Sequence, residues 1–175
     1  MLLLDKNYFD LFNLPRTFAI DEQFLEQQYR DLVAAVHPDR FVTDSPEQRR
    51  LAMQAATLAN EAWRCLRDPC SRAAYLCRLE GISVDNAARA GASAEFLTEQ
   101  MEWREALDEA RLAARRPDLQ ALQVEVAEAR RRALSTVTEL IDTRADFEAA
   151  ASLVGQLMYI ERFSEQVDEA LDDLS

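Results

Sequence analysis

A chain of 175 residues is long enough for one large domain or for two smaller ones with separate hydrophobic cores. It holds only three glycines and five prolines, and its 32 acidic residues against 20 basic ones give a net charge of −12. This composition favours an all-α fold and argues against nucleic-acid binding, which needs a basic surface.

The first elements of the chain are predicted to be helices. A short helix is expected over 7–15, and Asp21 is expected to cap a longer one. In that longer helix, apolar side chains recur at steps of three and four residues as far as Val36.

The tripeptide HPD follows this helix and contains the only histidine of the chain, His37. The residue before a proline is pushed out of the α region, and Pro38 has no N–H group to donate, so the helix must end at Val36. We therefore expect His37, Pro38 and Asp39 to form an exposed turn. Such a turn is either an ordinary helix stop or a contact surface for a partner.

A third helix is expected after Ser45, because a serine followed by Pro46 and Glu47 is typical of a helix start. Two amphipathic helices joined by about ten polar residues should pack as an antiparallel pair with HPD at the tip. Another short helical piece is expected over 70–80. One face of the third helix carries the predicted core residues Leu51, Ala55, Leu58, Ala62 and Leu66, with Trp63 beside them.

The second half of the chain is predicted to be a separate domain. Residues 81–93 hold two of the three glycines and few large apolar side chains, so they are expected to connect a domain over 1–80 to one over 94–175. Three helical stretches (94–115, 118–141 and 145–172) with short connections predict an antiparallel three-helix bundle. Residues 78–175 contain 21 of the acidic residues and 11 of the basic ones, a charge that would steer a basic partner towards this half.

The helix that begins at 94 has apolar residues on two faces. Projection at 100° per residue places Phe96, Trp103, Leu107, Ala110 and Ala114 on one core stripe. Leu97 and Met101 fall on the opposite side beside Glu102, Glu105 and Glu109, an arrangement typical of a protein-binding patch. The alternatives are incidental exposure of two apolar side chains and a solvated acidic face with Arg104, Arg111 and Arg115 as pairing partners.

Three stretches, YFDLFNLP, YRDLVAAVHPDRF and LANEAWRCLRDPCSRAAYL, resemble the J-domain of DnaJ-type co-chaperones. Together with EFLTEQMEWREALDE and the helical second half, the chain resembles the HscB family, the J-proteins of iron–sulfur cluster assembly. The resemblance implies an N-terminal J-domain, a helical hairpin with an HPD loop, followed by a client-binding bundle. It also implies stimulation of the ATPase of a DnaK-type chaperone, HscA, and delivery of the scaffold protein IscU to it.

The resemblance also assigns site residues. The chaperone-binding residues would be His37, Pro38 and Asp39, together with Arg30 and Arg40 on a basic face that is thin because Asp31 adjoins Arg30. The client-binding residues would be Leu97, Thr98, Met101, Glu102, Glu105, Glu109 and Tyr159, although Tyr159 on the last helix could equally be core. The alternative function is a general J-protein that delivers other clients to DnaK, and a plain helical adaptor would have no use for HPD.

Other functional classes find little support in the sequence. Cys65, Cys70 and Cys77 match no zinc or redox spacing and are expected to be small buried hydrophobes. A lone histidine on a turn lacks an orienting acid, and there is no glycine-rich phosphate loop, so we expect neither an enzyme nor a bound metal or cofactor. The short apolar start MLLLDK and the absence of a long apolar window predict a cytoplasmic protein that does not enter a membrane.

Overall fold

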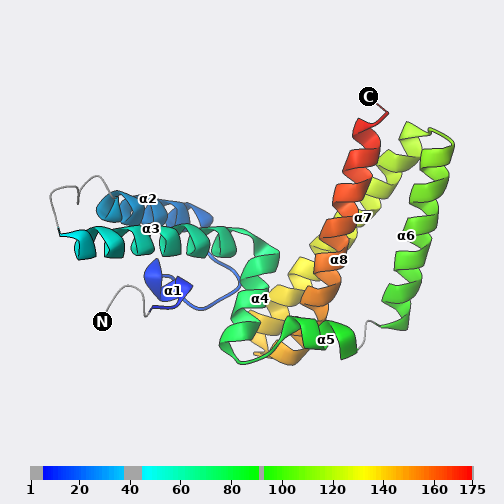
Figure 1. The fold of residues 1–175 in the computed structure, drawn as a ribbon. Helices are drawn as coiled ribbons and strands as arrows, with labels where there is room; N and C mark the ends of the chain where they lie inside the picture. Colours follow the sequence, from blue (N-terminus) through cyan, green and yellow to red (C-terminus); the bar gives the residue numbers. More distant parts are fainter. Residues whose placement is uncertain (1–5, 38–44, 91–92, 175) are drawn as a thin grey trace. The chain divides into compact units, whose positions relative to one another are not determined.

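The structure, a computed structural model, describes residues 6–37, 45–90 and 93–174. Within these ranges every regular element is a helix, as Figure 1 shows. The chain divides into two compact units, which we call unit 1 (Met1–Leu76) and unit 2 (Cys77–Ser175). The division lies close to the predicted end of the first domain at 80, and the all-α prediction is confirmed.

Unit 1 is built around a helical hairpin. Helices α2 (Glu22–Val36) and α3 (Pro46–Arg67) pack along each other, and the short α1 (Tyr8–Leu11) packs on α3 (Figure 1). The Asp21 carboxylate caps α2 by accepting the backbone N–H of Phe24 at 3.0 Å. Ser45 and Gln48 form a reciprocal capping box at the start of α3. Both predicted helix starts are therefore confirmed.

The core face of α3 differs from the predicted one. Ala55, Ala62 and Leu66 are buried, as predicted. Leu51 is 37% exposed and Leu58 is half-buried, so the two leucines do not lie in the core. Small side chains let α3 lie close to α1 and α2, whose Phe9, Phe12 and Leu25 are fully buried. The buried residues of α3 are Ala52, Ala55, Ala59, Ala62 and Leu66.

Helix α4 (Pro69–Leu79) follows α3 and contains the division between the units. It ends at Leu79, and Gly81, shortly after it, has a φ of +79°, a left-handed conformation that glycine adopts without strain. Residues 81–93, the predicted connector, contain one further helix, α5 (Val84–Ala90), which packs against α8.

Unit 2 contains the three long helices expected for the bundle. These are α6 (Ala94–Leu112), α7 (Arg116–Thr138), which continues into the π-helical turn η3 (Glu139–Thr143), and α8 (Phe147–Asp172). Helices α7 and α8 pack along each other, and α6 packs on both (Figure 1).

The end of α6 corrects one predicted core residue. The helix ends at Leu112, and Ala114 is exposed with a φ of +49°, so it does not extend the core stripe. Pro117 lies in the first turn of α7, where its missing N–H group costs no helical hydrogen bond. This proline therefore begins a helix instead of closing the preceding one.

Candidate functional site

His37 lies at the C-terminal end of α2 and is exposed. Its φ of −59° and ψ of 128° take the chain out of the helix, as the following proline requires. The predicted helix end at Val36 is therefore confirmed. Pro38, Asp39 and Arg40 lie outside the described residues.

Arg30, the described member of the predicted basic face, is exposed on α2. Its Nη2 donates to Gln27 Oε1 at 3.5 Å, and the Gln27 amide donates to both carboxylate oxygens of Asp31 at 3.0 Å. The side chains of Arg30 and Asp31 are thus linked through Gln27. This arrangement keeps a negative charge beside the arginine, in agreement with a thin basic face.

An aromatic cluster holds the hairpin of unit 1 together. The rings of Tyr29 on α2 and Trp63 on α3 are stacked with centroids 4.7 Å apart. The Tyr29 hydroxyl donates to Asn60 Oδ1 at 2.8 Å, and Trp63 Nε1 donates to Glu26 Oε2 at 3.0 Å. The Arg67 guanidinium lies 4.9 Å from the centroid of the Trp63 ring. Because each of these contacts except the last joins the two helices, the cluster fixes the pair that carries His37.

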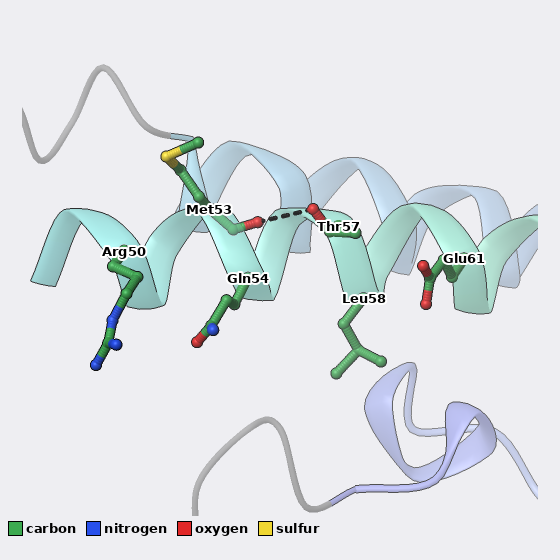
Figure 2. Close-up of a pocket in the computed structure, with 6 residues that line it drawn as sticks. All are labelled: Arg50, Met53, Gln54, Thr57, Leu58 and Glu61. Carbon is green, nitrogen blue, oxygen red and sulfur yellow. Dashed lines mark hydrogen bonds between the residues drawn. The ribbon is translucent and has the colours of Figure 1, made fainter. Parts of the chain in front are cut away.

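A groove on α3 begins in its second turn and was not foreseen from the sequence. Figure 2 shows its side chains along one face of the helix, with the Thr57 hydroxyl donating to the Met53 carbonyl oxygen at 3.0 Å. Met53 is 60% exposed, and the groove has a volume of about 420 Å³. Because the sequence predicts Leu58 to be a core residue, the spacing does not indicate a groove on this face. The groove is lined by Arg50, Met53, Gln54, Thr57, Leu58 and Glu61.

The outward face of α6 carries two exposed apolar side chains. Leu97 is 50% exposed and Met101 is 72% exposed, although both belong to a helix whose other face is buried. The predicted exposure of this pair is confirmed. The opposite face contributes Phe96, Trp103, Leu107 and Ala110 to the core of unit 2.

Polar residues surround this pair on α6. Glu102, Glu105 and Glu109 are all exposed, as the helical projection predicts. Thr98 is also exposed, and its hydroxyl donates to the backbone carbonyl of Ala94 at 3.0 Å. The patch therefore combines two apolar side chains with a row of carboxylates, and its role in binding stays a prediction.

Tyr159, the predicted client-binding residue on α8, is half-buried. Its ring meets Phe96 edge-on at 5.9 Å and stacks on Phe163 at 6.1 Å. The Arg104 Nε donates to the Tyr159 hydroxyl at 3.2 Å, and this hydrogen bond raises the pKa of the guanidinium above its ordinary value. Tyr159 thus lies at the seam between α6 and α8, partly in the core and partly at the surface.

An acidic hollow of about 620 Å³ lies beside the first turns of α6. Glu99 forms a 3.8 Å ion pair with Arg132 on α7, and Glu125 accepts a 2.9 Å hydrogen bond from Trp103 Nε1. Glu99 and Glu125 could not be predicted from the sequence as site residues, because their proximity depends on the register of α6 against α7. The hollow is lined by Ser93, Glu95, Phe96, Thr98, Glu99, Glu102, Glu125 and Gln156.

The three cysteines form no disulfide. Cys70 and Cys77 are buried, as expected for small hydrophobes, and Cys65 is half-buried. The Cys77 Sγ lies 3.7 Å from the carbonyl oxygen of Phe147, and burial raises the pKa of this thiol from 9.0 to about 11. In the part of the chain that the structure describes, no three His, Cys, Asp or Glu side chains are grouped so that they could hold a metal ion.

The Cys77 thiol is expected to make stability fall as the pH rises from 9 to 11. An unfolded chain loses this proton near 9.0 and the folded chain near 11, so the folded state binds more protons between these values. The contribution of the Cys77 thiol to stability is fully present below pH 9. Above pH 9 it is lost progressively, which lowers the free energy of unfolding by on the order of 2 kcal/mol. Urea unfolding across this pH range measures the loss.

The variant Cys77→Ala separates this effect from other groups that titrate at high pH. Below pH 9, removal of the buried sulfur lowers the stability by a constant amount, and between pH 9 and pH 11 the stability of the variant should fall less steeply than that of the wild type. Equal slopes in the two proteins would contradict the raised thiol pKa.

Comparison with known proteins identifies the family. Residues 92–168 match a family model described as the HSCB C-terminal oligomerisation domain. A co-chaperone protein HscB homolog from Bordetella avium is 47% identical over 161 residues, which are 92% of this chain and 95% of that protein. The chain belongs to the HscB family of co-chaperones.

Solved structures of HscB proteins extend this agreement to the fold. Chaperone HscB from Vibrio cholerae has a TM-score of 0.85 and 34% sequence identity over 97% of this chain and all of that one. Human co-chaperone protein HscB has a TM-score of 0.86 and 28% identity over 94% of this chain and 82% of that one. The predicted architecture, an HscB-type J-domain followed by a helical bundle, is thereby confirmed. None of the described helices has the length and apolar character needed to cross a membrane.

Proposed function

We propose that this member of the HscB family binds the iron–sulfur scaffold protein IscU through unit 2 and brings it to the DnaK-type chaperone HscA. In this role it stimulates the ATPase of HscA through His37, Pro38 and Asp39, with Arg30 and Arg40 as further contact residues. The chain itself performs no chemistry and needs no cofactor. Its expected location is the cytoplasm.

The observation that carries the proposal is the patch on unit 2. Two apolar side chains that are 50% and 72% exposed, Leu97 and Met101, lie on one helix beside exposed carboxylates and a half-buried tyrosine. Protein interfaces commonly combine an apolar centre with a polar rim in this way. The proposed contact set is Leu97, Thr98, Met101, Glu102, Glu105, Glu109 and Tyr159.

The HPD turn acts on the chaperone by differential affinity. A co-chaperone that binds the hydrolysis-ready conformation of the ATPase more tightly than the resting one shifts the population towards hydrolysis without touching the nucleotide. His37 suits such a contact because it is exposed at the end of a hairpin that the Tyr29 and Trp63 rings hold together. Asp39 offers a carboxylate that an arginine of a partner can pair with.

The two proposed surfaces belong to separate units, His37 to unit 1 and the Leu97–Met101 pair to unit 2. One chain can therefore hold the scaffold and engage the chaperone at the same time. The excess of acidic residues in the second half also favours a scaffold whose contact surface is basic.

Steady-state ATP hydrolysis by HscA, with and without this chain and IscU, tests the proposal. We expect this chain to raise the rate of HscA and IscU to raise it further, with no hydrolysis by this chain alone. A general J-protein would instead stimulate DnaK with unfolded clients at least as well and would gain nothing from IscU. That result, or hydrolysis by the isolated chain, would contradict the proposal.

A further inference from the structure

Arg104 on α6 contacts the Tyr159 side chain on α8. Its Nε donates to the tyrosine hydroxyl at 3.2 Å, and its guanidinium carbon lies 5.8 Å from the centroid of the ring. Among the described residues, Arg104 is the hydrogen-bond partner of this hydroxyl. The arginine therefore touches both the polar end and the face of the same ring.

The other neighbours of Tyr159 fix its ring from inside unit 2. Phe96 meets the ring edge-on, and Phe163 stacks on it with an interplanar angle of 8°. Phe163 in turn stacks on the fully buried Trp103 at 5.6 Å. These contacts hold the inner side of the ring, whereas the hydroxyl end depends on Arg104.

Helix geometry places Arg104 on the same face as the exposed apolar pair. Met101 lies three residues before Arg104, and Leu97 lies four residues before Met101, so the three side chains are neighbours on the surface of α6. A tyrosine held by Arg104 is therefore held beside Leu97 and Met101. Without the hydrogen bond, the phenol would gain rotamer freedom that a partner must remove again on binding.

We propose that Arg104 is a positioning residue of the client site: it acts through the Tyr159 hydroxyl and holds this ring in place beside Leu97 and Met101. This inference rests on the proposed function of the patch. It assigns the partner contact to Tyr159 and not to the arginine.

A double-mutant cycle with the full chain tests the inference. Arg104→Met keeps an unbranched side chain without hydrogen-bond donors, and Tyr159→Phe keeps the ring without its hydroxyl. Each single variant should weaken binding of IscU by about fivefold, the factor that one typical hydrogen bond or one immobilised side chain represents. The double variant should also weaken binding by about fivefold, because both changes remove the same link. Calorimetric titration gives the four affinities.

Arg111→Met is the matched control for charge and helix position. Arg111 also lies on α6 and also reaches α8, where its Nη2 donates to the backbone carbonyl of Gln166 at 3.0 Å. Its removal changes the net charge by the same amount as Arg104→Met, and the affinity should stay unchanged. An equal loss in this control would mean that charge, and not positioning, accounts for the effect.

Two outcomes of the cycle would overturn the positioning role. Losses that multiply to about 25-fold in the double variant would show that Arg104 contacts the scaffold independently of Tyr159. Unchanged affinity in both single variants would show that the hydrogen bond has no part in binding. Equal unfolding midpoints of all four proteins ensure that the affinities report on the site and not on the stability of the bundle.

A measurement without a partner separates this inference from the proposed function. The chain has four tyrosines, so the ring signals of Tyr159 can be assigned in carbon-13 NMR spectra by comparison with Tyr159→Phe. Arg104→Met should shift these signals, and Arg104→Lys, which retains a donor, should shift them less. Unshifted signals would overturn the positioning role alone, whereas a wild-type chain that does not bind IscU would overturn the proposed function.

Discussion

Replacement of His37 by glutamine is expected to abolish stimulation of the HscA ATPase while IscU binding remains intact. His37 is exposed at the end of α2 in unit 1, and the proposed scaffold patch lies in unit 2. A glutamine amide cannot reproduce the two ring nitrogens of an imidazole or their geometry. A loss of roughly 1.4 kcal/mol in differential affinity for the hydrolysis-ready chaperone already lowers the stimulated rate about tenfold. Single-turnover ATP hydrolysis measures the rate, and calorimetry measures the scaffold affinity.

Gln23→Ala is the control for this variant, because Gln23 is exposed near the opposite end of the same helix. It should leave both the stimulated rate and the scaffold affinity unchanged. Unfolding curves of the two variants should match the wild type, since neither side chain is buried. Simultaneous loss of stimulation and of scaffold binding in His37→Gln would contradict the separation of the two surfaces.

The starts of α2 and α3 and the end of α2 were predictable because local chemistry sets them, whereas α1 (Tyr8–Leu11) is shorter than the helix predicted over 7–15. The Asp21 carboxylate and the Ser45 hydroxyl satisfy N–H groups in the first turns of α2 and α3, and a proline forces α2 to end at Val36. These interactions span three or four residues. A sequence therefore contains all the information that they need.

The predicted core stripe of α3 was wrong at Leu51 and Leu58, because two adjacent faces of this helix have the same spacing. Leu51 and Leu58 repeat with the helical period, and so do Ala52 and Ala59, one position later. Hydrophobicity favours the leucines, but the close approach of α1 and α2 selects the smaller residues. This outcome depends on tertiary packing, which the period of one helix does not contain.

For the patch on α6, the exposure of side chains was predictable, but the contacts with other helices were not. The exposure of Leu97 and Met101 follows from their angular position on a single helix, so projection was sufficient. The contact between Arg104 and Tyr159 joins residues that are 55 positions apart and depends on how α6 lies against α8. Glu125 could not be predicted for the same reason, because its hydrogen bond with Trp103 depends on how α7 packs against α6.

The double variant Leu97→Ala with Met101→Ala is expected to weaken IscU binding by about 2 kcal/mol or more, roughly thirtyfold in the dissociation constant. Both side chains are exposed and available as the apolar centre of an interface, so truncation removes area that a partner would bury. The free energy of unfolding should change by less than about 0.5 kcal/mol, since exposed side chains contribute little to it. Calorimetric titration measures the affinity, and urea unfolding measures the stability.

Leu112→Ala provides a matched control, because Leu112 is a 90% exposed apolar residue at the end of the same helix and outside the proposed patch. It should bind the scaffold like the wild type. The double variant should also stimulate HscA normally when no scaffold is present, whereas His37→Gln should lose this stimulation. Loss of stimulation alone in His37→Gln and loss of scaffold binding alone in the double variant would follow only from independent surfaces on the two units. Unchanged affinity in the double variant would exclude Leu97 and Met101 from the scaffold site.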